Sequence, residues 1–190
     1  MFYWFCHLVV GAFLKVFYGL RVEGIENFPR EGPVLLACNH RSNMDPVAVG
    51  CALQRPIHFM AKEELFKIYV LKWIITQWKA FPVKRGGGDR KAIKTALDIL
   101  KENGIVGLFP EGTRSKTGEL GPAHPGVGLL AVKGNCPVVP VALLGTQKPL
   151  GPITVKIGKA LKFSKSEGEK LRAEAVSGKI MEEIAKLLEE

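Results

Sequence analysis

Cysteine is scarce in this chain, and its pattern excludes two common kinds of site. The four cysteines among 190 residues have neither the spacing of a metal-binding pair nor that of a redox dithiol: Cys6, Cys38, Cys51 and Cys136. Three of them lie in apolar runs, so buried free thiols are expected. Free thiols suit a reducing, cytoplasmic environment. We expect neither a metal site nor a bound cofactor.

Acidic residues are few relative to basic ones, and 27 basic against 18 acidic residues give a formal net charge of +9. Most of the excess lies in residues 55–94, which hold ten basic and three acidic residues. Aromatic residues share this segment, among them Phe66, Tyr69, Trp73 and Trp78. Anionic lipid, a phosphorylated substrate or nucleic acid would suit such a stretch, and a solvated surface is the alternative. Nucleic acid rests on charge alone, so we do not expect it as a partner.

The segment from Met1 to Leu20 is apolar and aromatic, and only His7 and Lys15 interrupt it. No positively charged segment precedes this run and no small-residue cleavage site follows it, so a signal peptide is not expected. At about 1.5 Å per residue, such a helix is long enough to just cross a bilayer core. We expect an apolar, membrane-associated helix that enters one leaflet. A full span and a buried helix of a soluble core are the alternatives.

Neither an internal repeat nor a low-complexity linker divides the remaining sequence. Its length suits one domain with a real core, and a hydrophobic content of 47% argues against disorder. We therefore expect the N-terminal helix within residues 1–23 and one folded domain at residues 24–190.

Short apolar runs alternate with helical stretches along this domain, which is typical of the α/β class. We expect strands at residues 34–38, 57–61, 81–84, 105–109, 138–144 and 153–157. Helices are expected at residues 46–53, 62–79, 89–103, 126–133 and 166–188, with Asp89 as an N-cap and Gly104 as a C-cap. These elements predict a largely parallel central sheet flanked by helices. Ligand sites in such sheets lie beyond the carboxyl ends of the strands.

The first of these strand ends carries a histidine and an aspartate. His40 follows the strand, and four residues separate it from Asp45, which opens the next helix. Histidine is the natural general base at neutral pH, and it needs a partner that holds the ring and favours the imidazolium. A turn between the two residues can fold the carboxylate back onto a ring nitrogen. The spacing therefore indicates a base and the residue that orients it.

Other interpretations of this segment remain open. Asp45 ahead of Pro46 could simply cap the helix, and His40 could be a satisfied core histidine. A metal is less favoured, because no further ligand lies nearby at a suitable spacing. Cys38 shares a strand face with His40 and could act as a nucleophile instead.

A second polar loop follows the strand at residues 105–109. It reads Phe109-Pro110-Glu111-Gly112-Thr113-Arg114-Ser115, in which proline fixes the turn and glycine permits close backbone approach. The arginine fork suits a phosphate or a carboxylate. Arg85, after the strand at residues 81–84, is expected at the same edge of the sheet. A base without a nucleophile from the chain, beside two arginines, indicates a phosphorylated substrate with a hydroxyl to activate.

Four blocks, in order, resemble those of the membrane glycerolipid acyltransferases, and in particular the bacterial 1-acyl-glycerol-3-phosphate acyltransferases. The similarity covers nearly the whole chain after the N-terminal helix. The blocks are Asn39-His40-Arg41-Ser42-Asn43-Met44-Asp45-Pro46, Phe81-Pro82-Val83-Lys84-Arg85, Phe109 to Ser115, and Val138-Val139-Pro140-Val141. The chain departs from the family pattern at Lys79, at Lys84 and at Ala123-His124-Pro125-Gly126.

The resemblance implies a role for each block. His40, held by Asp45, would deprotonate the free hydroxyl of lysophosphatidic acid, and that oxygen would attack the thioester of acyl-CoA or acyl-carrier protein. Phosphatidic acid would form without a covalent enzyme intermediate. Arg85, Glu111 and Arg114 would bind the glycerol-phosphate, in a pocket shaped by Gly112 and Thr113. Further residues would shape the site: Asn39, Ser42, Pro110 and Pro140.

The resemblance thus makes residues 24–190 an acyltransferase domain, held to the cytoplasmic face of the cell membrane by the N-terminal helix. Membrane lipids, lysophosphatidic acid and the acyl donor are the expected partners. Two alternative hypotheses remain: an acyltransferase with another acceptor, such as glycerol-3-phosphate or a different lysophospholipid, and a non-catalytic lipid-binding protein.

Overall fold

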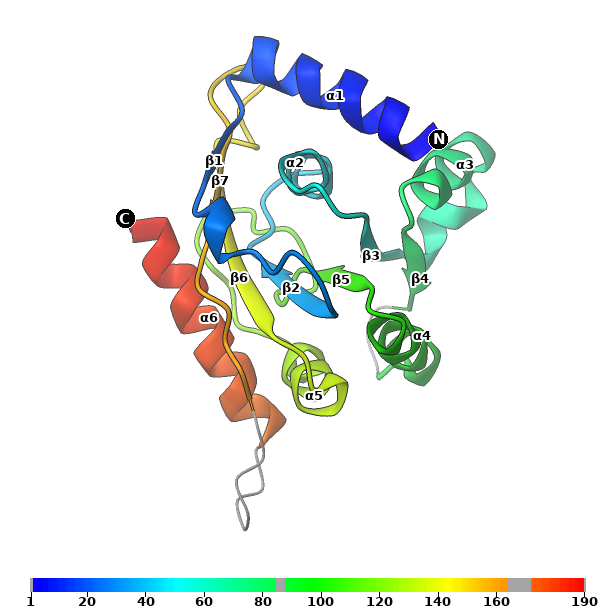
Figure 1. The fold of residues 1–190 in the computed structure, drawn as a ribbon, viewed down its shortest axis with the longest axis vertical. Coiled ribbons are helices and arrows are strands. Elements are labelled where there is room, and N and C mark those ends of the chain that lie inside the picture. The colour runs from blue at the N-terminus through cyan, green and yellow to red at the C-terminus, as the bar shows by residue number, and fades with distance from the viewer. Residues whose placement is uncertain (1, 85–87, 164–171, 190) are drawn as a thin grey trace.

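Seven strands form one central sheet in the order β1-β7-β6-β2-β5-β3-β4 (Figure 1). The computed structural model describes residues 2–84, 88–163 and 172–189. The strands are β1 (Arg21–Glu23), β2 (Val34–Cys38), β3 (Ile57–Lys62), β4 (Phe81–Val83), β5 (Ile105–Leu108), β6 (Val138–Leu144) and β7 (Thr154–Ile157). All neighbouring pairs are parallel except β6 and β7, which are antiparallel. The expectation of a largely parallel sheet is confirmed.

Strand β2 lies at the centre of the sheet, and its sequence is uninterruptedly apolar. All five of its residues are buried, as a parallel strand covered on both faces requires. Leu36 is in register with Gly107 of β5 on one side and with Val139 of β6 on the other. A Cβ at Gly107 would overlap the ring of Phe59 on β3, so glycine leaves room there for an aromatic side chain.

Helices cover both faces of the sheet. Helices α1 (Phe2–Tyr18) and α2 (Asp45–Ala52) pack on one face, where Leu14, Ala48 and Val49 join a common core with β2. Helices α4 (Arg90–Lys101), α5 (Pro125–Gly134) and α6 (Ala173–Glu189) cover the other face (Figure 1). Short 3-10 helices occur at η1 (Ile25–Asn27) and η2 (Glu63–Lys67), and α3 is Tyr69–Gln77.

The expectation of one continuous helix over residues 62–79 is wrong. The segment divides into η2 and α3, because Ile68 between them adopts an extended backbone conformation. The break has a packing cause: η2 lies against β3 and β4, whereas α3 contacts chiefly η2 and contains no buried residue.

Both ends of α4 show how local sequence fixes a helix. The Asp89 carboxylate accepts hydrogen bonds from the backbone N–H groups of Lys91 and Ala92, so the expected N-cap is confirmed. At the other end, Asn103 rather than Gly104 adopts the left-handed conformation, with φ 59°. The Gly104 N–H then donates to the carbonyl of Ile99 over 2.9 Å. Asparagine tolerates this conformation better than most residues.

The two ends of the chain differ in detail from the sequence-based expectation. The sequence-based boundary between residues 23 and 24 placed Arg21–Glu23 with the N-terminal helix. In the structure these three residues form an edge strand, β1, that pairs with β7. Among the described residues, no helix is both long and apolar enough to cross a membrane. The C-terminal helix is described from Ala173, and the expected start of that helix, residues 166–171, lies outside the described residues.

Candidate active site

The turn after β2 brings the His40 ring and the Asp45 carboxylate together. Nδ1 of His40 lies 2.7 Å from Oδ2 of Asp45, so the contact predicted from the spacing is present. Both residues are buried: His40 is 8% exposed and Asp45 is 0% exposed. Because a carboxylate can only accept, Nδ1 carries the donated hydrogen. This bond leaves Nε2 as the ring nitrogen that can take a substrate proton.

The Asp45 carboxylate organises the turn as well as the ring. Its Oδ2 also accepts the backbone N–H groups of Arg41 (2.6 Å) and Ser42 (2.7 Å). The Ser42 hydroxyl in turn accepts the N–H of Met44 over 3.2 Å. Met44, not Asp45, occupies the N-cap position of α2, and no side chain caps the helix there. The helix-cap interpretation of Asp45 is therefore wrong: its carboxylate points back to the His40 turn.

An aromatic stack fixes the other side of the His40 ring. The ring lies on Phe109 with centroids 4.0 Å apart and planes 17° apart, and Phe109 stacks in turn on Phe59 at 5.8 Å. A flat aromatic face stacked on the imidazole restricts rotation of the ring. The sequence assigned Phe109 only to a strand end and Phe59 only to a strand, so this part of the site was missed.

Glu111 bridges the two polar loops through both of its oxygens. Oε1 accepts the backbone N–H of His40 over 2.7 Å, and Oε2 accepts the N–H of Gly121 over 3.0 Å. The Ser115 N–H donates to the His40 carbonyl over 2.8 Å, which adds a second tie between the loops. Glu111 is 7% exposed. Its carboxylate therefore braces the His40 turn, and its direct contact with a substrate stays a prediction.

Gly112 is required by both its conformation and its surroundings. Its φ is 67°, and a Cβ there would come 2.5 Å from Cδ2 of His124. His124 is tied to the same loop, because its N–H donates to the carbonyl of the buried Pro110 over 2.8 Å. The next two residues, Thr113 and Arg114, are exposed, so the Arg114 guanidinium group is accessible to an anion.

Two further predicted site residues lie in the sheet or directly after one of its strands. The buried Asn39 side chain accepts the N–H of Leu143 over 2.7 Å and donates to the Leu143 carbonyl over 3.1 Å, which joins the end of β2 to β6. Pro140 is buried in β6, in register with Ala37, and its ring lies against Gly158. Asn39 therefore fixes the position from which the His40 turn departs, whereas Pro140 lies deeper in the sheet.

The structure bears on the possible role of Cys38 as a nucleophile. Cys38 is completely buried, and this burial, with a smaller effect of the nearby Asp45 carboxylate, raises the pKa of its thiol well above the ordinary value. A protonated, inaccessible thiol does not act as a nucleophile, so the Cys38 alternative is disfavoured.

Arg85, the second arginine predicted at the site, lies outside the described residues. Among the described residues, no cluster of three or more His, Cys, Asp or Glu side chains could hold a metal ion.

The assembled site is a buried imidazole with one nitrogen held by a carboxylate, next to a loop that presents an accessible arginine. Such an imidazole can remove a proton from a hydroxyl and later return it to a leaving group.

Comparison with known proteins shows the family to which the chain belongs. The family model described as Acyltransferase matches residues 19–144. This match covers the His40 turn, the loop of Glu111 and most of the sheet, so the chain belongs to the acyltransferase family.

Its relatives include proteins with one recurring name. The 1-acyl-sn-glycerol-3-phosphate acyltransferase of Bacillus subtilis is 38% identical over 147 residues, which cover 75% of this chain and 71% of that protein. The protein of the same name from Pseudomonas aeruginosa is 30% identical, with 90% of this chain and 73% of that protein covered. The crystal structure of the 1-acyl-sn-glycerophosphate (LPA) acyltransferase from Thermotoga maritima superposes with a TM-score of 0.76 at 25% identity, covering 98% of this chain and 80% of that one.

Proposed function

We propose that this enzyme transfers a fatty acyl group to the sn-2 hydroxyl of 1-acyl-glycerol-3-phosphate, forming phosphatidic acid. The acyl donor is acyl-CoA or acyl-carrier protein. The observation that carries the proposal is the buried His40–Asp45 pair, 2.7 Å apart, beside the loop that exposes Arg114. The names of the B. subtilis and P. aeruginosa relatives support the choice of acceptor.

His40 acts as the general base. Nε2 removes the proton of the acceptor hydroxyl while the oxygen forms a bond to the thioester carbonyl carbon. The tetrahedral intermediate then expels the thiolate, which takes the proton back from Nε2. Asp45 holds the ring in the required tautomer and stabilises the imidazolium in the transition state. The stacked Phe109 ring restricts rotation of the imidazole. This sequence of steps needs no metal or prosthetic group, because the thioester is already activated.

The acceptor phosphate is bound by the Arg114 side chain, with Arg85 as the second cation. A guanidinium matches a phosphate with two parallel hydrogen bonds, so it fixes orientation as well as charge. Gly112 keeps the loop in the left-handed turn that presents Thr113 and Arg114 to solvent.

The enzyme acts at the cytoplasmic face of the membrane, with α1 in the lipid interface. One face of this helix is packed, since Leu14 is 0% exposed in the core. The opposite face exposes large apolar side chains: Trp4, Phe5, Leu8, Val9, Phe13, Val16 and Phe17. A helix with such a face lies in the plane of an interface and places the active site near its lipid acceptor.

Turnover with a panel of donors and acceptors tests the proposal. Wild-type protein should form phosphatidic acid from lysophosphatidic acid with acyl-CoA or acyl-carrier protein. His40→Ala should lower kcat by about 10²–10⁴-fold, the usual contribution of general base catalysis. His58→Ala serves as a control for removal of a histidine remote from the turn. Near wild-type turnover of His40→Ala would refute the mechanism.

The same panel addresses the acceptor. Equal or faster acylation of a lysolipid without a phosphate would remove the role of Arg114 and favour another acceptor. Absence of product with every donor and acceptor, from a folded protein that binds anionic vesicles, would favour a lipid-binding protein without catalysis.

A further inference from the structure

Helix α3 exposes an apolar surface that the described chain does not cover. None of its residues is buried. Tyr69 is 87% exposed and Val70 66% exposed, and two large apolar side chains next to them are exposed as well: Ile68 and Ile74. Soluble proteins rarely expose a continuous apolar patch of this kind, and such a patch marks a site of interaction.

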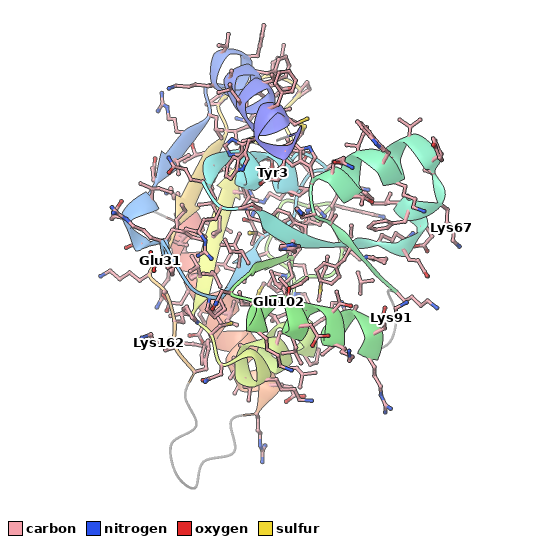
Figure 2. The ribbon with its side chains drawn as sticks, turned by 45° about the vertical axis from the view of Figure 1, so that its right-hand side comes forward. Tyr3, Glu31, Lys67, Lys91, Glu102 and Lys162 are labelled. Carbon is pink, nitrogen blue, oxygen red and sulfur yellow. The ribbon has the colours of Figure 1, made fainter. Side chains whose placement is uncertain are left out.

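This surface continues the exposed face of α1. Tyr3 of α1 and Trp78, at the end of α3, have ring centroids 6.1 Å apart. The Trp78 ring also lies against α2, where a Cβ at Gly50 would be 3.1 Å from it. Figures 1 and 2 show α1 and α3 at one end of the molecule and α4 and α5 at the opposite end. Trp78 therefore ties α3 to the helix that the proposed function already places in the lipid interface.

The charges around α3 indicate which occupant the surface suits. Residues 62–79 contain four lysines and two glutamates. Lys67, labelled in Figure 2 beside this region, and Lys72 are exposed. Lysines that border an apolar helical face are the pattern of helices that lie on anionic lipid, where each lysine adds to the attraction. An apolar partner protein would not need this border of positive charge.

The position of α3 also connects the surface to the chemistry. The 3-10 helix η2 joins α3 to β3 and packs against β3 and β4. Phe59 of β3 stacks on Phe109, which stacks on His40. Phe59 and Phe109 belong to the core on the face covered by α1 and α2. The His40 ring and the apolar faces of α1 and α3 therefore lie on the same side of the sheet.

We propose that α3 is a second membrane contact, which inserts its apolar face into anionic lipid beside α1 and presents the His40 side of the sheet to the membrane. This inference rests on the proposed function, since it assumes that the acceptor is drawn from a lipid surface. Two helices fix the orientation of the protein on the membrane more firmly than α1 alone, because the second contact opposes rotation about the α1 axis.

Co-sedimentation of full-length protein with vesicles tests the proposal. The vesicles contain phosphatidylcholine alone or phosphatidylcholine with phosphatidylglycerol. Tyr69→Ser/Val70→Ser should weaken binding to both by about tenfold or more, because two large apolar side chains leave the lipid. Lys67→Gln/Lys72→Gln should weaken binding to the anionic vesicles by about fivefold per lysine, and leave binding to neutral vesicles unchanged.

Matched controls separate α3 from general changes in charge or apolarity. Lys91→Gln/Lys94→Gln on α4 removes the same charge from another face, and Ile25→Ser removes another exposed apolar side chain. Both controls should bind like the wild type. Thermal melts check folding, which the α3 variants should retain because the substituted side chains are exposed.

Three outcomes overturn the proposal. The first is vesicle binding by the α3 variants that equals that of the wild type. The second is an α4 control that is as impaired as the lysine variant on α3. A dimer that dissociates only in Tyr69→Ser/Val70→Ser, with unchanged vesicle binding, would assign the surface to a second copy. Acylation of a short-chain acceptor in detergent micelles should be unchanged in every variant. A wild type that is inactive in micelles refutes the proposed function, independently of the vesicle result.

Discussion

The most informative single side chain is Glu111, whose two oxygens are both occupied by backbone N–H groups. The resemblance to known acyltransferases places this residue among the groups that bind the acceptor. A carboxylate beside a phosphate would repel it, whereas a carboxylate that accepts the His40 N–H over 2.7 Å fixes the backbone of the base. The geometry therefore favours Glu111 as a positioning residue.

Glu111→Gln separates these roles. The glutamine amide can accept only one of the two N–H groups and directs its own hydrogens toward the other, so the His40 turn should shift. We expect kcat to fall about tenfold to a hundredfold, as small misplacements of catalytic groups do, with the acceptor KM little changed. Steady-state kinetics measures both constants. Arg114→Gln is the control for lost binding and should mainly raise KM. A raised KM with normal kcat in Glu111→Gln would restore the role as a substrate ligand.

The sequence predicts local pairs of residues well and distant ones poorly. His40 and Asp45 are five positions apart, so a single turn after a strand was enough to predict their contact. Glu111 lies 71 positions from His40, and Phe109 approaches the ring only because β2 and β5 are neighbours in the sheet. No local sequence pattern predicts the contact of Glu111 or of Phe109 with His40, because both contacts depend on the strand order.

At the scale of elements, the close packing of α5 on α6 depends on one glycine. The Gly128 N–H donates to the Ser177 hydroxyl over 3.1 Å, and a Cβ at Gly128 would overlap the carbonyl oxygen of Ala173. That oxygen belongs to the backbone, so relief requires the two helices to move apart. Gly178 on α6 is a matched contrast, since a Cβ there would meet no atom and the position is exposed.

The two glycines should respond in opposite directions to alanine. Gly128→Ala should lower the free energy of unfolding by about 1–3 kcal/mol, as overpacking does. Gly178→Ala should raise it by up to about 1 kcal/mol, because alanine is the better helix former. Thermal melts followed by circular dichroism measure both, with about 2–4 °C expected per kcal/mol. A stabilised Gly128→Ala would show that the helices are not held at this distance.

Elements were predictable where one local cause dominates. Apolar runs predicted β2 and β6 with the bounds that the structure has, and the capping aspartate predicted the start of α4. The break at Ile68 was not predictable, because it arises from two different packing partners for η2 and α3. The short strand β1 also escaped prediction, since three residues at a sheet edge carry too little pattern.

At the scale of the whole molecule, the sequence predicted the class of fold but not its arrangement. Alternation of strands and helices indicated a largely parallel sheet. It did not indicate that β2 lies between β5 and β6, nor that β7 runs antiparallel to β6. This order brings the turn of His40 beside the loop of Glu111, so the site is a property of the assembled sheet.

The stability of the whole fold should depend on pH through His58, a half-buried residue of β3. Burial lowers the pKa of His58, and the nearby Lys79 charge lowers it further, while the hydrogen bond to the Ile105 carbonyl and the Glu102 charge oppose this change. Nδ1 of His58 lies 3.2 Å from that carbonyl oxygen. A lowered pKa means that the unfolded chain takes up a proton at a higher pH than the folded one does.

Acidification should therefore lower the stability in a first step, at a pH above the range in which Asp89 titrates. The contribution is complete above the unfolded pKa of histidine, about 6.5, and is lost as pH falls from there to the lowered pKa of the folded state. A second loss should follow at lower pH, because the N–H groups of Lys84, Ala92 and Lys91 lower the pKa of Asp89. The stability due to Asp89 is present above its unfolded pKa, about 3.9, and disappears as pH falls through the folded value.

His58→Gln tests the first of these two steps, because glutamine keeps a donor for the Ile105 carbonyl and does not titrate. Between pH 7.5 and pH 5.5, the Tm of the wild type should fall by about 2 °C more than that of the variant, a modest effect that suits a half-exposed group. Below about pH 4 the two proteins should lose stability in parallel, since Asp89 is intact in both. Equal slopes for the two proteins above pH 5.5 would mean that His58 carries no proton linkage in this fold.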